Sequence, residues 1–274
     1  MHLRSRGTTW VWESPGPPGA PTLLLLHGWT ATAALNWFPS LGPLGERYHV
    51  VAMDLRGHGR GIRSRRPFRL EACADDAAAL CQALLLEPVT AVGYSMGGPV
   101  AQLLWRRHPQ SVAGLVLCAT AGCFTEPSPA VQTLGRALAV GVGMLPAAAQ
   151  ARLARCSGRF RPPAKPPADW AVAERRPSSL GALIGAGVAL NGWNAQRWLA
   201  DIDVPVAIVQ TRTDRVVTWE RQLRMAEAIA GARVFPIDAD HGACVERADL
   251  FVPALLDACA AVASHRPQGA RDRP

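Results

Sequence analysis

The stretch Gly-Tyr-Ser-Met-Gly at residues 93–97 constrains the fold of this chain more than any other feature. An apolar run precedes it at residues 89–92, and residues 98–108 carry apolar side chains at helical spacing. The pattern predicts a short buried strand that turns sharply into a helix, with Ser95 in a tight turn between two glycines. Such a short motif also arises by chance in Gly-rich chains, and the flanking strand and helix favour a functional interpretation. The helix N-terminus points unpaired N–H groups toward any anion formed beside Ser95, so this serine is a candidate nucleophile.

Strand and helix patterns alternate on both sides of this turn. An early strand is expected at residues 8–12, and the predicted buried strands comprise residues 22–26, 49–53, 89–92, 112–118, 204–210 and 233–237. The predicted helices of the same part of the chain comprise residues 70–86, 98–108, 219–230 and 246–263. This order predicts an α/β fold with a doubly wound, mostly parallel sheet.

The alternation stops at about residue 122 and resumes near residue 204. The interval is rich in Pro, and helical patterns occur at residues 131–145, 147–155 and 180–199. We therefore predict a core of residues 1–121 and 204–264, with residues 122–203 inserted as a helical cap over the carboxyl edge of the sheet, where such folds bind ligands. Residues 265–274 are polar and basic and are predicted to be disordered.

The charge of the chain comes almost entirely from arginine. The formal net charge is +8, and Lys165 is the only lysine among 29 basic residues. Arginine clusters at residues 60–69 and 152–161 could contact anionic lipid or an acidic substrate, and a solvated surface is the favoured interpretation. Basic and aromatic residues do not interleave, and no nucleic-acid motif is present, so no nucleic-acid partner is predicted.

Cysteine usage and hydropathy favour a cytoplasmic protein. The seven cysteines form no C-x-x-C pair, and several stand in apolar contexts; they are residues 73, 81, 118, 123, 156, 244 and 259. The first residues carry charge without an apolar core, which is not the pattern of a signal peptide. The longest apolar runs, residues 137–149 and 180–190, are shorter than the ~18 residues that a membrane span needs. No stable membrane insertion is expected, although the cap could make weak interfacial contact.

A hydroxyl nucleophile needs a base, and the base needs an orienting acid. Among seven histidines, only His241 lies just beyond a late strand, on a Gly-containing loop before a helix. It is therefore predicted to reach the sheet edge that carries Ser95 and to act as the base. His27 and His58 lie in tight loops beside glycines, and we expect them to brace the backbone.

The predicted orienting acid is Asp214. It follows a late strand and lies between the nucleophile and the base in chain order, as in sheets of this type. Asp238 and Asp240 compete because they neighbour His241, but close neighbours on a loop usually point apart, and Asp240 is expected to bind the loop backbone. Asp54 is expected to accept hydrogen bonds within its own Gly-rich turn.

Acyl transfer also requires two N–H donors for the oxyanion. The residue after the nucleophile, Met96, is predicted to supply one. The loop after the strand at residues 22–26 should supply the other, which makes the Trp29 amide the candidate. The Trp29 indole could at the same time plug the mouth of the site.

Together these residues resemble the α/β-hydrolase superfamily over nearly the full length of the chain. The resemblance is carried by His27-Gly28-Trp29, Asp54-Leu55-Arg56-Gly57-His58-Gly59, Gly93-Tyr94-Ser95-Met96-Gly97-Gly98, Asp214 and His241-Gly242. It implies a sheet of about eight strands, a helical cap, a Ser-Asp-His triad, and neither a cofactor nor a metal.

Differences from particular groups of the superfamily reduce the number of activities that this sequence is expected to have. Relatives that open epoxides or displace halide carry Asp where this chain has Ser95, and the epoxide enzymes use cap tyrosines, whereas the only tyrosines here are Tyr48 and Tyr94. Relatives that cleave carbon–carbon bonds share Ser-Met-Gly-Gly but tend to place Trp after the catalytic His, where this chain has Gly242. The His-Gly-Trp loop resembles that of arylesterases and cofactor-free haloperoxidases, which would allow a perhydrolase side reaction.

The predicted cap carries many apolar residues, which would suit an apolar ester. These residues are Leu134, Leu138, Val142, Met144, Leu145, Leu183, Ile184, Val188, Leu190 and Trp193. They could equally pack the cap onto the sheet.

We expect a serine hydrolase that cleaves an apolar, small-to-medium acyl or aryl ester. A carbon–carbon bond hydrolase, an acyltransferase or perhydrolase, and a non-catalytic ligand-binding protein are the alternatives. The expected partner is a small molecule, and the sequence does not indicate an oligomeric state.

Overall fold

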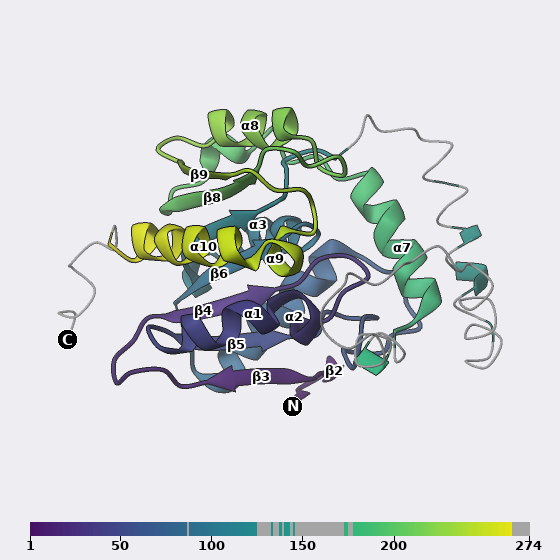
Figure 1. Ribbon diagram of the computed structural model, residues 1–274. Helices are drawn as coiled ribbons and strands as arrows, with labels where there is room; N and C mark the ends of the chain where they lie inside the picture. The colour runs from purple at the N-terminus through teal and green to yellow at the C-terminus, as the bar shows by residue number, and fades with distance from the viewer. Residues whose placement is uncertain are drawn as a thin grey trace.

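A mostly parallel sheet forms the centre of the molecule (Figure 1). The computed structural model describes residues 1–86, 88–124, 133, 137, 138, 140–142, 145, 173, 174 and 178–264. In spatial order the strands of the main sheet are β3 (Val11–Ser14), β5 (His49–Met53), β4 (Thr22–Leu26), β6 (Val89–Tyr94), β7 (Val112–Cys118), β8 (Val206–Thr211) and β9 (Arg233–Ile237). Only β3 runs antiparallel to its neighbour, so the predicted α/β class with a doubly wound, mostly parallel sheet is confirmed.

The expected number of strands was wrong for the described residues, in which the main sheet has seven strands rather than about eight. The early strand expected at residues 8–12 is interrupted. β1 (His2–Leu3) and β2 (Gly7–Thr8) form a separate two-stranded sheet. The interruption follows from a side-chain contact, because the Thr9 hydroxyl donates to the Asp54 carbonyl at 2.7 Å and holds the chain between β2 and β3.

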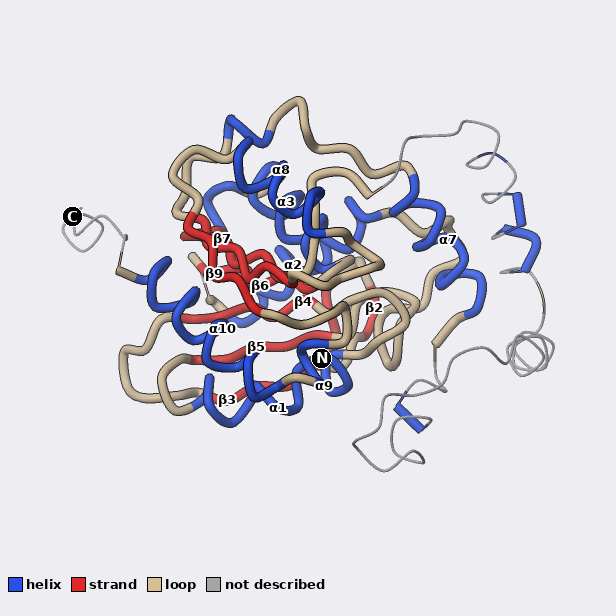
Figure 2. Tube along the Cα trace, turned by 45° about the horizontal axis from the view of Figure 1, so that its top comes forward, coloured by secondary structure: helices blue, strands red, loops and turns tan. Residues whose placement is uncertain are grey.

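Helices cover both faces of the main sheet (Figure 2). One apolar cluster includes residues of α1 (Ala33–Gly45), α9 (Ala243–Glu246) and α10 (Ala248–Ala263). The other includes residues of α2 (Leu70–Leu84), α3 (Gly97–Arg107), α7 (Leu180–Asn191) and α8 (Trp219–Ala228). Two 3-10 helices, η1 (Pro109–Ser111) and η2 (Leu199–Asp201), precede β7 and β8. The helix expected at residues 246–263 is divided at Arg247, where the backbone leaves helical geometry.

Strand β4 shows why the central strands are apolar at every position. Leu24 and Leu26 belong to one apolar cluster, and Leu23 and Leu25 belong to the other. All four are fully or almost fully buried. Because side chains alternate across a strand and helices cover both faces, each position needs an apolar residue. This core holds the ends of β4, β6, β8 and β9 at fixed positions.

Helix α7 is the longest described element within residues 122–203, the range expected to form the cap. The Ser179 amide donates to the Gly57 carbonyl at 2.8 Å, and the Ser178 hydroxyl accepts from the Gly59 amide at 2.9 Å. A Cβ on Gly57 would lie 2.1 Å from the Ala182 Cβ, so this close approach requires glycine.

Other predictions for this region lie outside the described residues. They concern the helix at residues 147–155, most of the helix at 131–145, Leu134, Met144, Cys156 and the tail at 265–274. None of the six cysteines within the described ranges takes part in a disulfide bond. In the same ranges no helix is both long enough and apolar enough to cross a bilayer.

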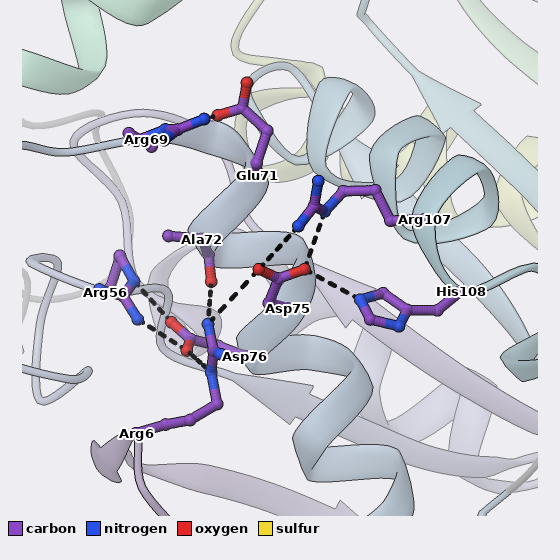
Figure 3. Close-up of polar contacts among 9 residues, drawn as sticks. All are labelled: Arg6, Arg56, Arg69, Glu71, Ala72, Asp75, Asp76, Arg107 and His108. Atoms are coloured by element: carbon purple, nitrogen blue, oxygen red, sulfur yellow. Dashed lines mark hydrogen bonds and ion pairs between the residues drawn. The ribbon is translucent and has the colours of Figure 1, made fainter.

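A network of ion pairs connects the hairpin of β1 and β2 to helices α2 and α3 (Figure 3). Asp76 on α2 has a fully buried side chain and accepts hydrogen bonds from Arg6 and Arg56. The neighbouring Asp75 accepts two hydrogen bonds from Arg107, at 2.8 and 3.0 Å, and one from His108 at 2.9 Å. The network therefore joins β1 and β2, the loop after β5, α2 and the end of α3.

Two buried histidines brace the loops after β4 and β5, as the sequence predicts. Nδ1 of His27 lies 2.7 Å from the Gly28 carbonyl oxygen, and Nε2 of the same ring accepts a hydrogen bond from the Leu55 amide at 2.9 Å. Burial lowers the pKa of His27 to about 4. Burial and the nearby His27 lower the pKa of His58 to about 3. Both rings are therefore neutral in the folded protein at neutral pH.

We expect the free energy of unfolding to fall as the pH drops from about 6.5 to about 4. In this range His27 and His58 take up protons in the unfolded chain but stay neutral in the folded protein. Each of them therefore lowers the free energy of unfolding by about 1.4 kcal/mol for each pH unit that the pH falls. His58→Phe should reduce this slope by about one proton, and the exposed His2→Gln should leave it unchanged. Denaturant titrations between about pH 6 and 5 measure the slope. Equal slopes for wild type and His58→Phe would contradict this origin.

Candidate active site

Ser95 occupies the sharp turn between β6 and α3 that the sequence predicts. Its φ is +50°, a left-handed conformation that a non-glycine residue adopts only when its surroundings hold it there. The Ser95 amide donates to the Cys118 carbonyl at 2.9 Å. The Ser95 carbonyl accepts from the Gly98 amide at 2.9 Å and from the Thr120 hydroxyl at 2.8 Å. These three hydrogen bonds hold the strained residue in place.

The glycines around Ser95 are required by close backbone contacts. A Cβ on Gly93 would lie 2.3 Å from the Gly97 carbonyl oxygen. A Cβ on Gly97 would lie 2.0 Å from the Leu26 carbonyl oxygen. The turn therefore packs directly against the end of the neighbouring strand β4, and any side chain at these positions would push Ser95 away from its partners.

His241 follows β9 and lies between Ser95 and Asp214. Its Nε2 is 2.9 Å from the Ser95 Oγ, and its Nδ1 is 2.7 Å from Oδ2 of Asp214. The His241 carbonyl accepts from the Tyr94 hydroxyl at 2.8 Å. Burial raises the pKa of Tyr94 well above its usual value, so this hydroxyl keeps its proton and holds the histidine loop against β6.

Asp214 lies in the loop after β8 and is fixed by four hydrogen bonds. Its Oδ1 accepts from the amides of Val216 and Val217 at 2.8 and 2.9 Å. Its Oδ2 accepts from the Thr211 hydroxyl at 2.9 Å, in addition to the contact with His241. The carboxylate is fully buried, so it presents one fixed lone pair to the imidazole. This arrangement selects the tautomer that carries the proton on Nδ1 and leaves Nε2 free to accept a proton.

Gln222 is a polar residue of the site that sequence reasoning did not identify. It lies on α8 and is completely buried. Its amide donates to the Thr211 hydroxyl at 2.8 Å and to the Val217 carbonyl at 2.7 Å, while its Oε1 accepts from the Thr211 amide at 3.1 Å. Because the Thr211 hydroxyl accepts from Gln222, its own proton is directed to Asp214. The only signal for this role in the sequence is a polar residue eleven positions after the end of a strand.

The competing carboxylates lie elsewhere, as the sequence predicts. Asp240 accepts from the Gly242 amide at 2.9 Å and so binds the histidine loop. Asp54 accepts from the amides of Ala33 and Arg60 at 2.8 and 2.9 Å. Asp238 is exposed and lies 3.6 Å from Arg212.

The two candidate oxyanion donors have free N–H groups. Within the described part of the chain, neither the Trp29 amide nor the Met96 amide donates to a protein acceptor. Met96 directly follows Ser95 and precedes the first residue of α3. The loop of Trp29 also lies beside Ser95, because a Cβ on Gly28 would be 3.4 Å from the Ser95 Cβ. Two N–H donors next to a candidate nucleophile would suit a developing oxyanion.

The Trp29 side chain reaches α7. Its indole Nε1 donates to the Leu183 carbonyl on α7 at 2.8 Å, and the ring lies against Gly187. The indole is 41% exposed, so it forms part of the wall between the oxyanion loop and α7. Among the residues that the structure describes, no group of three His, Cys, Asp or Glu side chains could hold a metal ion.

The chain matches a family model and resembles several known hydrolases. The model, described as the alpha/beta hydrolase fold, matches residues 21–248. RutD of Agrobacterium fabrum, a carbamate hydrolase by name, is 27% identical over 93% of this chain and 97% of its own length. The pimeloyl-[acyl-carrier protein] methyl ester esterase of Neisseria meningitidis is 28% identical over 88% of this chain and 94% of its own.

A solved structure extends the comparison to three dimensions. The crystal structure of a hydrolase from Pseudomonas aeruginosa PA01 superposes with a TM-score of 0.75 at 25% identity, covering 92% of this chain and 94% of that chain. The family match spans most of the chain and includes every residue of the site described above. The protein therefore belongs to the alpha/beta hydrolase family, and its relatives support its being a hydrolase.

Proposed function

We propose that the protein is a serine hydrolase that cleaves carboxylic esters through an acyl-enzyme on Ser95. The observation that carries this proposal is the continuous chain of contacts from the Ser95 Oγ through His241 to Asp214, at 2.9 and 2.7 Å. Both distances are within hydrogen-bond range.

In the first half of the proposed reaction, the Ser95 Oγ attacks the ester carbonyl and its proton passes to Nε2 of His241. The carbonyl electron pair moves to oxygen, and the amides of Trp29 and Met96 donate to the resulting oxyanion. When the oxyanion collapses, the bond to the alkoxy group breaks, and the leaving oxygen takes the proton from His241. Asp214 remains ionised and stabilises the imidazolium.

In the second half, a water molecule attacks the acyl-enzyme. His241 takes a proton from the water, a second oxyanion forms at the same donors, and its collapse returns the proton to the Ser95 Oγ. The products are a carboxylic acid and the free enzyme. An alcohol or hydrogen peroxide in place of water would give acyl transfer or perhydrolysis at the same site.

We further propose that residues 122–203 form a cap whose described apolar side chains favour an apolar acyl or aryl group. Leu183, Ile184 and Val188 on α7 are all partly buried, and the Trp29 indole is bonded to the first of them. An acyl chain against such a surface would gain about 0.8 kcal/mol for each CH₂ that it buries. The expected substrate is a small molecule.

A panel of p-nitrophenyl esters with acyl chains of increasing length tests the proposal. Wild type should hydrolyse them, with KM decreasing as the chain lengthens, and Ser95→Ala should reduce kcat by at least about 10⁴-fold. The carbamate hydrolase relative is the reason to include a p-nitrophenyl carbamate in the panel.

Asp240 provides the matched control for Asp214, because both carboxylates bind the histidine loop. Asp214→Asn should lose most of the ester turnover because the imidazole would no longer be held in the required tautomer. Asp240→Asn keeps an oxygen acceptor for the Gly242 amide and should retain turnover within a few-fold. Turnover by Ser95→Ala close to that of wild type would remove Ser95 from the mechanism.

Thr211 is expected to position Asp214, because its hydroxyl accepts from Gln222 and donates to the Asp214 carboxylate. Thr211→Val removes one of the four hydrogen bonds to Asp214 while keeping the shape of the side chain. We expect kcat to fall about 10-fold, or ~1.4 kcal/mol, with little change in KM. Thr211→Ser restores the hydroxyl and should restore kcat. Steady-state kinetics on a p-nitrophenyl ester measures both constants, and a Thr211→Val enzyme with unchanged kcat would contradict the positioning role.

A further inference from the structure

A second cavity lies beside the N-terminal half of α2, and the catalytic residues do not line it. Its volume is about 380 Å³, within the range of small-molecule sites. Its arginines come from the N-terminal hairpin, the loop after β5, the start of α2 and the end of α3; they are Arg6, Arg56, Arg63, Arg66, Arg69 and Arg107. None of the steps of the proposed ester hydrolysis uses this cavity.

The carboxylates around the cavity do not neutralise these arginines. Glu71 and Asp75 are in the lining, and Asp76 is completely buried behind it. Asp75 and Asp76 bind the arginines that form the floor, as Figure 3 shows. Six guanidinium groups therefore meet three carboxylates in and directly behind the lining, and Asp54 attracts Arg63 from outside it, which leaves a surplus of at least two positive charges.

The surplus is concentrated on the loop after β5. Residues 55–70 include six arginines and no Asp or Glu. Arg66 makes no ion pair with any carboxylate of the described chain, and Arg69 has only an exposed contact with Glu71 at 3.4 Å. Arg63 is exposed, and its guanidinium donates to the Gly59 carbonyl. The sequence favours a solvated basic surface here, but a solvated surface does not require a cavity.

The shape and charge of this cavity favour a small phosphorylated ligand over a membrane surface. A flat bilayer cannot enter a concave site, whereas a small anion can contact guanidinium groups from several walls at once. Guanidinium groups bind phosphate oxygens through two parallel hydrogen bonds. A diphosphate carries enough negative charge to balance this surplus. The floor arginines are already oriented by Asp75 and Asp76, so little side-chain entropy would be lost on binding.

We propose that this arginine cavity binds a small organic diphosphate. The ion pairs with Asp75 and Asp76 hold the floor of the site, and Arg66 and Arg69 close over the phosphoryl groups. The proposal is independent of the ester hydrolase activity, since it rests on a different set of residues.

Isothermal titration calorimetry with inorganic pyrophosphate in about 0.15 M salt tests the proposal, because long-range attraction is screened at that concentration. Pyrophosphate should bind one site per chain, at least about 10-fold more tightly than orthophosphate, because it reaches more of the guanidinium groups. Arg66→Ala should weaken binding at least about 5-fold, and Arg66→Lys should fall between this variant and wild type because lysine cannot bind in bidentate fashion.

Arg233→Ala is the matched control, because it removes the same charge from β9 at the opposite edge of the sheet from β3. It should bind pyrophosphate as wild type does, and ester turnover by Arg66→Ala should equal that of wild type. No heat of binding, or equal affinity for wild type and Arg66→Ala, would overturn the proposal. Arg66-dependent binding to phosphatidylserine vesicles without pyrophosphate binding would also overturn it and would assign the arginines to a membrane surface.

Discussion

The parallel order of the sheet strands is the constraint on which the contact between Ser95 and His241 depends. The two residues are separated by 146 positions in the chain, yet Oγ and Nε2 lie 2.9 Å apart. They meet because β6, β8 and β9 run parallel, so the loops that leave these strands open at one edge of the sheet. The continuous apolar strands and the helices on both faces keep that edge rigid. Any loss of register between β7 and β8 would separate the nucleophile from both of its partners.

Ser95 is one of five non-glycine residues with a positive φ among the described residues; the others are Ser5, Thr30, Leu85 and Ala119. Ser95 adopts a positive φ, and it stays there because its own carbonyl and amide are bonded to α3, Thr120 and Cys118. Such a conformation costs on the order of 1–3 kcal/mol, which the packed core offsets. The strained turn, the helix N-terminus and the free amides are therefore parts of one arrangement around Ser95.

Chain order and local spacing predicted the class of fold and the close approach of Ser95, His241 and Asp214. Ser95, Asp214 and His241 were predictable because each follows a strand pattern, and the parallel sheet brings such ends together. The network of Thr211 and Gln222 was not predictable, because it depends on how α8 packs over β8 rather than on a motif. The N-terminal strands were also misread: the Thr9 hydroxyl bond to Asp54 interrupts an alternating pattern that looks continuous in the sequence.

The catalytic proposal depends on a Ser95 hydroxyl that is made nucleophilic by its neighbours, and covalent labelling tests this directly. A fluorophosphonate probe reacts with an activated serine, and peptide mass spectrometry then locates the adduct. The account predicts a single adduct on the peptide that contains Ser95, formed much more slowly in a chain that carries Asn in place of Asp214. Labelling at another residue, or none at Ser95 in the folded wild-type protein, would contradict it.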